Sequence, residues 1–320
     1  MKIGKLFFGL GCTVLLAACA PSSYKLSQPA PSNLKVANAS TEQTVISHYD
    51  QREGEGRIFH SGVLNSTLQL GDSPLEPMSF LNKYTQEELV SRGINAKVEA
   101  GQASMPVSHI RTFKMTNHRT NAYTPYISMT WLSADVETAA GKKRIAAFIK
   151  RGKVPVWSFD EIVEPTLNQP MSLLVKEYSA KLSAHLYGYK SSDEDVQKLL
   201  AKLNGKRTDT SYLDVYALGF TNNPSAIEPI AALVKDSDEY VRLAAISSLG
   251  TLRASGKMDL LKEVYNKADT WSDRAMALKA IGDLDTEESR GFLLSERGRW
   301  EKAGTDKESV WNAQIIALYL

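Results

Sequence analysis

Two groups of residues in this chain have side chains whose types could carry chemistry. His109 and His118 could begin a zinc site if a hairpin brought them together, because zinc accepts imidazole ligands. Asp160, Glu161 and Glu164 form an acidic cluster, and paired carboxylates cleave glycosidic bonds when they flank the bond at a defined separation. Two imidazoles are too few for zinc, and the acidic cluster lies in a loop-like stretch with no sign of a sugar-binding cleft. We expect exposed polar residues at both places.

The other residue types that serve catalysis are absent or poorly spaced. No histidine stands in a His-Glu-x-x-His pattern, and neither a phosphate-binding loop nor a Gly-x-Ser-x-Gly turn occurs. The sequence therefore predicts no catalytic residue, no metal site and no cofactor, and we expect a protein that is not an enzyme. An enzyme remains a third hypothesis, and it requires a cleft in which residues such as His60, His109 or Asp160 converge.

Basic residues are concentrated in one short stretch. They are Lys142, Lys143, Arg144, Lys150, Arg151 and Lys153. One interpretation is contact with anionic lipid headgroups, lipopolysaccharide or an acidic partner. The other is a charged hairpin that keeps an edge strand from pairing with another chain. Because successive strand residues point to opposite faces, the six side chains need not form one patch.

The N-terminal segment carries the most informative pattern. Lys2 and Lys5 precede an apolar run that ends at Leu16, and this run is too short to cross a bilayer as a helix, so it is typical of a cleavable secretory segment. The tetrapeptide Leu16-Ala17-Ala18-Cys19 resembles the lipobox of bacterial lipoproteins. The resemblance implies that residues 1–18 are removed and that Cys19 is acylated, with palmitate among three chains in Gram-negative bacteria. Two or more chains make anchoring stable.

The residues around Cys19 bear on location and charge. Ala20 follows it, and since Asp at this place retains enterobacterial lipoproteins at the inner membrane, the resemblance implies an outer-membrane lipoprotein facing the periplasm. In a Gram-positive host the anchor would lie in the outer leaflet of the only membrane. Loss of Lys2 and Lys5 turns the net charge of +2 into 36 basic against 36 acidic residues, which excludes a strongly basic nucleic-acid binder. Cys12 is lost too, so no internal disulfide can form.

The remaining chain divides into three predicted regions. Residues 19–56 are rich in Pro and Ser and predict a flexible tether. Residues 57–190 mix the two periodicities, with helices at 77–92 and 170–187 and strands at 57–64, 94–98, 107–115, 126–136 and 144–149. This order predicts an α+β sandwich with helices on one side of a mostly antiparallel sheet. The strand–helix–strand–hairpin–helix order loosely resembles transport-auxiliary and YajG-like lipoproteins.

Residues 191–320 are helical in period, and they repeat. Segments 238–250 and 271–282 align 32 residues apart, which superposes Arg242 on Arg274 and Gly250 on Gly282. The pattern Asp-x-x-Val-Arg-x-x-Ala-x-x-x-Leu-Gly resembles the HEAT repeat, and it implies an α-solenoid of about four helix pairs. In such repeats the arginine bonds to an acidic residue or carbonyl of the adjoining repeat, as a structural ladder. The two glycines suit the left-handed position that ends a helix.

Function is predicted from this organisation rather than from a motif. Solenoids expose a long concave surface that holds other proteins. The leading hypothesis is a membrane-anchored, non-catalytic scaffold that binds a protein partner, as an accessory of an envelope assembly, secretion or transport machine. Trp271, Trp300 and Trp311 are candidate anchors on that surface, although core packing is the other expectation for at least two of them. The alternative is a transport accessory that binds a lipid or small ligand in the α+β domain.

Overall fold

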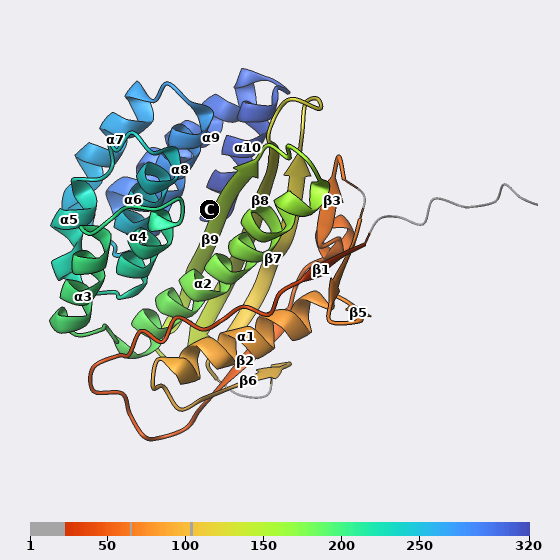
Figure 1. The fold of residues 1–320 in the computed structure, drawn as a ribbon. Coiled ribbons are helices and arrows are strands. Elements are labelled where there is room, and N and C mark those ends of the chain that lie inside the picture. The colour runs from red at the N-terminus through yellow and green to blue at the C-terminus, as the bar shows by residue number, and fades with distance from the viewer. Residues whose placement is uncertain (1–22, 65, 103–104) are drawn as a thin grey trace, which may run out of the picture.

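The computed structural model describes residues 23–64, 66–102 and 105–320, so the predicted signal and Cys19 lie outside the described residues. A sheet with two helices across one face forms the N-terminal part, and paired helices form the C-terminal part (Figure 1). The predicted α+β class followed by an all-helical region is confirmed. Among the described residues, none of the helices combines the length and the hydropathy that crossing a bilayer requires.

The main sheet is mixed, and the prediction of a mostly antiparallel sheet is wrong. Its strands are β2 (Thr44–Asp50), β3 (His60–Gly62), β6 (Ala96–Ala100), β7 (Val107–His118), β8 (Tyr126–Thr138) and β9 (Gly141–Lys153). Their order is β6-β2-β7-β8-β9, with β3 also beside β7. Strands β7, β8 and β9 form an antiparallel meander, whereas β2 pairs in parallel with β6 and β7. The chain leaves β2 and returns to β6 through a helix, and such a crossover produces parallel neighbours.

The predicted tether is wrong for residues 23–56. Two strands lie within it, β2 and β1 (Ser23–Leu26), and β1 pairs with β4 (Thr67–Leu70), which also pairs with β5 (Ser73–Pro74). Between β1 and β2, isolated apolar side chains such as Leu34 and Val36 are buried. The backbone N–H of Val36 donates to the carbonyl of Arg92 over 3.0 Å. This segment therefore covers the helical layer instead of extending away from it.

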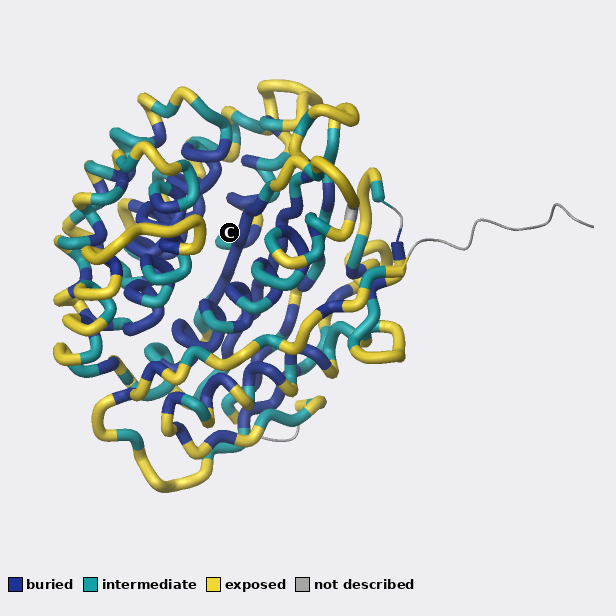
Figure 2. Tube along the Cα trace, viewed as in Figure 1, coloured by how far each residue is buried: buried dark blue, intermediate teal, exposed yellow. Residues whose placement is uncertain are grey.

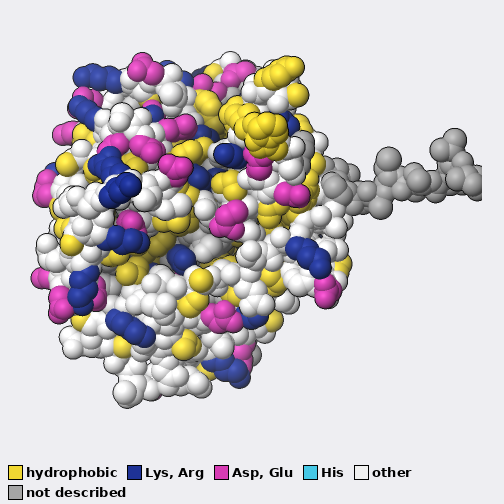
Figure 3. All heavy atoms as spheres, in the orientation of Figure 1, with side chains coloured by type: hydrophobic (Ala, Val, Ile, Leu, Met, Phe, Trp, Pro, Cys, Tyr) yellow, Lys and Arg dark blue, Asp and Glu magenta, His cyan; other side chains and the backbone are white. Residues whose placement is uncertain are grey.

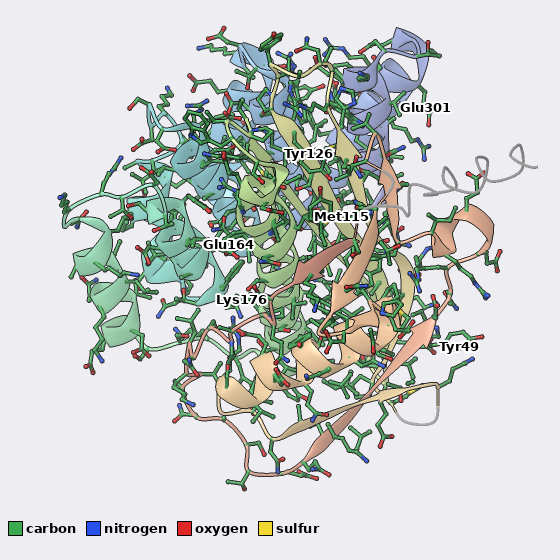
Figure 4. The ribbon with its side chains drawn as sticks, turned by 45° about the vertical axis from the view of Figure 1, so that its right-hand side comes forward. Tyr49, Met115, Tyr126, Glu164, Lys176 and Glu301 are labelled. Carbon is green, nitrogen blue, oxygen red and sulfur yellow. The ribbon has the colours of Figure 1, made fainter. Side chains whose placement is uncertain are left out.

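Two long helices cover one face of the sheet. Helix α1 (Pro77–Ser91) begins where the Glu76 carboxylate accepts backbone N–H groups, and α2 (Gln169–Tyr187) ends at Gly188 with φ of 66°. A short 3₁₀ turn (Phe159–Ile162) and a π-helical turn (Val163–Asn168) lead into α2. Met115 of β7 and Tyr126 of β8 are fully buried, and Figure 4 labels both on the strands of the sheet. Both helices were predicted to within about two residues at each end.

The C-terminal region contains four helix pairs in the described part of the chain, as predicted. They are α3 (Asp193–Leu203) with α4 (Ser211–Phe220), α5 (Ile227–Ala231) with α6 (Glu239–Thr251), α7 (Met258–Lys267) with α8 (Trp271–Leu284), and α9 (Glu287–Ala303) with α10 (Lys307–Ala317). Short 3₁₀ turns (Pro224–Ala226 and Ser255–Lys257) precede α5 and α7. We call α4, α6, α8 and α10 the inner helices and α3, α5, α7 and α9 the outer helices, by their positions relative to the sheet (Figure 1).

The repeat glycines serve close packing rather than helix termination. Gly250 and Gly282 lie inside α6 and α8, and a Cβ on Gly250 would come within 2.6 Å of the Ala280 Cα. The left-handed residues are Arg253 and Asp285, each three positions later, with φ of 51° and 53°. The prediction that these glycines adopt the left-handed conformation is therefore wrong. Their lack of a side chain lets neighbouring inner helices approach closely.

The inner helices pack against the protein's own sheet region. Helix α8 contacts β9, helix α4 contacts α2, and apolar side chains from both regions belong to one continuous core. Figure 2 shows buried segments on both sides of this contact. The concave side of the solenoid, which we expected to be open to a partner, is therefore filled by the N-terminal part of the same chain.

Candidate protein-interaction surface of the helical repeats

Arg242 and Arg274 make equivalent contacts in successive repeats. The Arg242 Nε lies 3.0 Å from Asp273 Oδ1, and its Nη1 donates to the carbonyl of Asp236 over 2.8 Å. Arg274 binds both carboxylate oxygens of Glu308, with 2.5 Å from Nε and 3.1 Å from Nη2, and it also donates to the carbonyl of Ala268. Each arginine thus ties one inner helix to an acidic residue in the first turn of the next. We call these contacts the arginine ladder.

A groove lies beside each rung of the arginine ladder. The first encloses about 390 Å³ between the second and third repeats, and the second encloses about 230 Å³ between the third and fourth. Residues of the first groove include Val234, Lys235, Arg242, Glu263, Lys267 and Asp273. Residues of the second are Tyr265, Asn266, Arg274, Arg299, Trp300 and Glu308. The connections 232–238, 268–270 and 304–306 run along this side of the solenoid, which we call the loop edge.

The two grooves present exposed charges around partly buried polar groups. Lys235 and Lys267 each lie 3.3 Å from the carboxylate of Glu263, and hydrogen bonds from both hold the pKa of Glu263 below its usual value. In the second groove the Trp300 indole donates to the Tyr265 hydroxyl over 2.9 Å. Burial raises the pKa of Tyr265, and its hydroxyl donates to the carboxylate of Glu296. Exposed lysines around carboxylates in the first groove, and an exposed arginine beside aromatic side chains in the second, suit contact with a polar protein surface.

A buried charge cluster joins the repeats to the sheet region. Glu177 and Lys181 of α2 meet Lys279 and Asp283 of α8, and we call these four residues the charge cluster. Lys279 lies 2.6 Å from Glu177 and 2.9 Å from Asp283, while Lys181 lies 2.6 Å from Asp283. Burial would raise the pKa of Asp283, but the two ammonium groups outweigh it and hold that pKa below its usual value. The cluster is closed to solvent, so it is a structural contact.

The charge cluster was missed in the sequence. Its signal is a pair of opposite charges at i and i+4 in each of two otherwise apolar helical segments, Glu177 with Lys181 and Lys279 with Asp283. Such spacing is ordinarily found on exposed helix faces. Its burial depends on the contact between α2 and α8, which lie about a hundred positions apart in the sequence.

The six basic residues of β9 do not form one anion-binding patch. Lys150 and Arg151 are buried, since Lys150 pairs with Glu239 at 2.7 Å and the Arg151 guanidinium lies 3.7 Å from the ring of Tyr240. Two others pair within the chain, Lys143 with Asp285 at 2.6 Å and Arg144 with Asp135. Only Lys142 and Lys153, at opposite ends of the strand, are exposed. These pairings and the length of β9 separate the six side chains, so they do not make one exposed surface.

The repeats also cover the edge of the sheet. The Tyr240 hydroxyl donates to the carbonyl of Gly152 over 2.6 Å and accepts from its N–H at 3.1 Å. Lys181 donates to the carbonyl of Ala146 over 2.7 Å. These side chains satisfy backbone groups that an edge strand would otherwise offer to another chain. Strand β9 is therefore not free for pairing with a partner.

The sequence candidates for metal or acid–base chemistry are separate in the structure. His109 and His118 lie on the same strand, β7, nine positions apart, and at about 3.3 Å per residue this places them about 30 Å from each other. Glu161 accepts backbone N–H groups from residues 156–158, and Glu164 accepts from Asn168. Among the residues that the structure describes, no group of three or more His, Cys, Asp or Glu side chains could hold a metal ion.

The three candidate tryptophans differ in position. Trp271 and Trp311 pack against one another with ring centroids 4.8 Å apart and ring planes tilted by 48°, and Trp311 also contacts His118 of β7. Lys150 of β9 lies 5.3 Å from the Trp271 ring. These two rings belong to the contact between the repeats and the sheet. Trp300 lies in the second groove and is the one of the three that can meet a partner.

The helical region is HEAT-like by comparison as well as by geometry. The sequence profile of the family described as HEAT repeats matches residues 196–282, which run from α3 to α8. No curated protein matches the chain. HEAT repeats act in general as scaffolds for protein–protein interaction, and the matched segment contains the first groove and the first rung of the arginine ladder.

Proposed function

We propose that this protein is a membrane-anchored lipoprotein of the periplasm that acts as a non-catalytic scaffold, and that its partner binds at the loop edge of the repeats. The observation that carries the proposal is the repetition of one arrangement, an arginine–carboxylate rung with a groove beside it, on a surface that remains open. Because the concave side is filled by the N-terminal part, the loop edge and the outer helices are the surfaces left for a partner.

The membrane anchor is supported by the resemblance of Leu16-Ala17-Ala18-Cys19 to a lipobox. Ala20 after the cysteine favours the outer membrane as the location. At that location the partner would belong to an envelope assembly, secretion or transport machine. The loop edge lies near the same end of the molecule as the β7–β8 hairpin, since Lys307 at the start of α10 contacts His118 at 2.7 Å.

The alternative, a lipid or small ligand bound in the α+β region, has less support. It predicts an apolar pocket between the β8–β9 hairpin and α2. That space is occupied by side chains from both sides, among them Leu132, Ala147, Leu174 and Tyr178, which are fully buried. A filled core offers no volume for a ligand.

Charge reversal at the first groove tests the proposal. Lys235 and Lys267 are exposed, so Lys235→Glu with Lys267→Glu should leave the fold intact while reversing the charge that a partner meets. Lys198→Glu on α3 is a matched control, because this lysine is equally exposed but lies outside both grooves. We expect the envelope protein that co-purifies with the parent to be lost from the double variant and retained by the control. Retention by both would contradict the proposal.

A further inference from the structure

A group of exposed apolar side chains lies at one end of the sheet. The loop before β8 presents Tyr123, which is 92% exposed, and the segment after β9 presents Val156 and Trp157 at 68% and 92% exposure. Both loops adjoin the same strand pair, because Tyr126 at the start of β8 is opposite Lys153 at the end of β9. We call Tyr123, Val154, Val156 and Trp157 the apolar tip. Figure 3 shows hydrophobic side chains gathered over this end of the molecule.

The apolar tip is held in a defined shape. The carboxylate of Glu161 accepts backbone N–H groups from Val156, Trp157 and Ser158 at 2.9, 2.8 and 3.1 Å. In the other loop the Arg119 guanidinium donates to carbonyls of residues 122 and 124. Exposing large apolar side chains to water is unfavourable, and a loop braced to do so suggests a surface that is covered in use.

The start of the described chain lies beside this tip. Strand β1 contacts the π-helical turn Val163–Asn168, and the same turn also contacts β8 and β9, the two strands that border the tip. The N–H of Ser27 donates to Asn168 Oδ1 over 3.0 Å, in the turn that follows the Trp157 loop. Cys19 precedes Ser23 by four positions, so its Cα lies within about 14 Å of the Ser23 Cα. An acylated Cys19 would hold this end of the protein at the bilayer.

We propose that the apolar tip inserts into the membrane interface, as a second contact that orients the protein against the bilayer to which Cys19 anchors it. The inference rests on the proposed lipid anchor. Trp and Tyr are the side chains that favour the interface between acyl chains and headgroups, and Lys153 beside them is exposed and positively charged, as anionic headgroups require. A tip of this kind would fix which side of the repeats faces away from the membrane.

Tryptophan quenching in vesicles tests this inference. The full chain is purified with its anchor and reconstituted into phosphatidylethanolamine–phosphatidylglycerol vesicles whose acyl chains carry bromine. The difference in fluorescence between the parent and Trp157→Phe isolates the Trp157 signal from that of the other tryptophans. We expect this signal to be quenched by the brominated chains and to be shielded from acrylamide in the water.

A relocated tryptophan provides the matched control. Val90 is 52% exposed and lies in the last turn of α1. The carbonyl of Arg92 accepts from the N–H of Val36, and the next residue, Ala37, donates to the carbonyl of Lys190, just after α2. Val90 therefore lies near the C-terminal end of α2, whereas the tip lies near its N-terminal end. In the variant with Trp157→Phe and Val90→Trp, the new indole should be quenched by acrylamide and not by brominated lipid.

The outcomes separate the inference from the proposed anchor. The intact mass of the purified protein reports whether Cys19 carries acyl chains, and a protein without them would overturn both. An acylated protein whose Trp157 remains open to acrylamide would overturn the inference alone. Shielding of Trp157 that occurs only when a partner protein is added would overturn it as well, because the tip would then be a protein-binding surface.

Discussion

Lys279 of α8 and Glu177 of α2 form an ion pair of 2.6 Å in which both side chains are completely buried. With Lys181 and Asp283 they place two positive and two negative charges inside the contact between the repeats and the sheet region. Taking charges out of water is costly, and the cluster is tolerated only because every charged group contacts an opposite one. The two regions are thereby fixed in one relative position, which explains why the concave side of the solenoid is unavailable to other proteins.

Lys279→Met should destabilise the protein strongly. Glu177 would keep only the ammonium of Lys181, and Asp283 would lose one of two, so the variant leaves uncompensated negative charge in the core. We expect a loss of about 3–5 kcal/mol in the free energy of unfolding, measured by urea denaturation. Lys198→Met, at an exposed ion pair on α3, should change it by less than about 1 kcal/mol. Equal losses in the free energy of unfolding for the two substitutions would show that burial of the charge cluster does not make its ion pairs more important than an exposed one.

A pH dependence should arise from His48 of β2. This imidazole is buried against Asn82 and Tyr178, and burial lowers its pKa from 6.5 to about 4. Because the unfolded chain binds a proton at a pH where the folded protein does not, stability is complete above pH 6.5 and falls as the pH drops toward 4. At pH 5 the loss should be about 2 kcal/mol relative to pH 7.5.

Unfolding measured in urea at both pH values checks this dependence. Burial also lowers the pKa values of His60, His118 and His185, so these groups add to the difference between pH 7.5 and pH 5. The variant His48→Gln should lose about 2 kcal/mol of that difference, while His109→Gln, on the same sheet, should keep all of it. A His48→Gln protein with the parental pH dependence would assign the effect to other groups.

The sequence allowed the helices and the repeat period to be predicted because their signals are local. Helix α1 has a capping Glu76 and a following glycine, and the repeats carry Ala and Leu at fixed spacing around Arg242 and Arg274. The alternating segment of β2 was overlooked because it follows a Pro- and Ser-rich stretch whose composition is typical of a tether. Once β2 was missing, β6 had no parallel neighbour, and the sheet was predicted as mostly antiparallel.

The burial and exposure of side chains around the candidate site were predicted incorrectly where they depend on contacts between distant parts of the sequence. Lys150 and Arg151 have the sequence context of an exposed basic hairpin, yet Glu239 and Tyr240 from the repeats bury them. Trp157 differs from its expected environment in the opposite direction, because this large apolar side chain is exposed and the neighbouring sequence does not indicate that. The role of the glycines in α6 and α8 likewise depends on which helix packs against them. The spacing of residues along one helix does not identify that neighbour.

Gly250→Ala should separate α6 from α8. The added Cβ would lie 2.6 Å from the Ala280 Cα and 2.8 Å from its carbonyl oxygen, both of them backbone atoms that cannot rotate away. We expect a loss of about 1–3 kcal/mol in stability. Gly291→Ala in α9 is the matched control, because no atom lies within 4 Å of its Cβ, and there the higher helix propensity of alanine should add up to about 1 kcal/mol. Thermal unfolding of both variants checks whether Gly250→Ala lowers the stability and Gly291→Ala raises it.

Arg274→Gln should loosen the last helix of the repeats. The substitution removes the bidentate contact with Glu308 in the first turn of α10. We expect faster amide hydrogen exchange in α10 and a global loss of about 1–2 kcal/mol. Arg297→Gln on α9, whose ion pair is exposed, should leave the exchange of α10 unchanged. Uniform acceleration across all helices would contradict a local role for this rung.

Site-specific crosslinking in native envelopes tests whether a partner binds at the loop edge. A photoreactive amino acid replaces Lys267 in the first groove, Asn266 in the second, or Lys198 on α3 as the control. We expect one protein to be crosslinked from both groove positions and to be absent from the control. Crosslinks from Lys198 alone, or from none of the three positions in a folded and membrane-bound protein, would contradict binding at the loop edge.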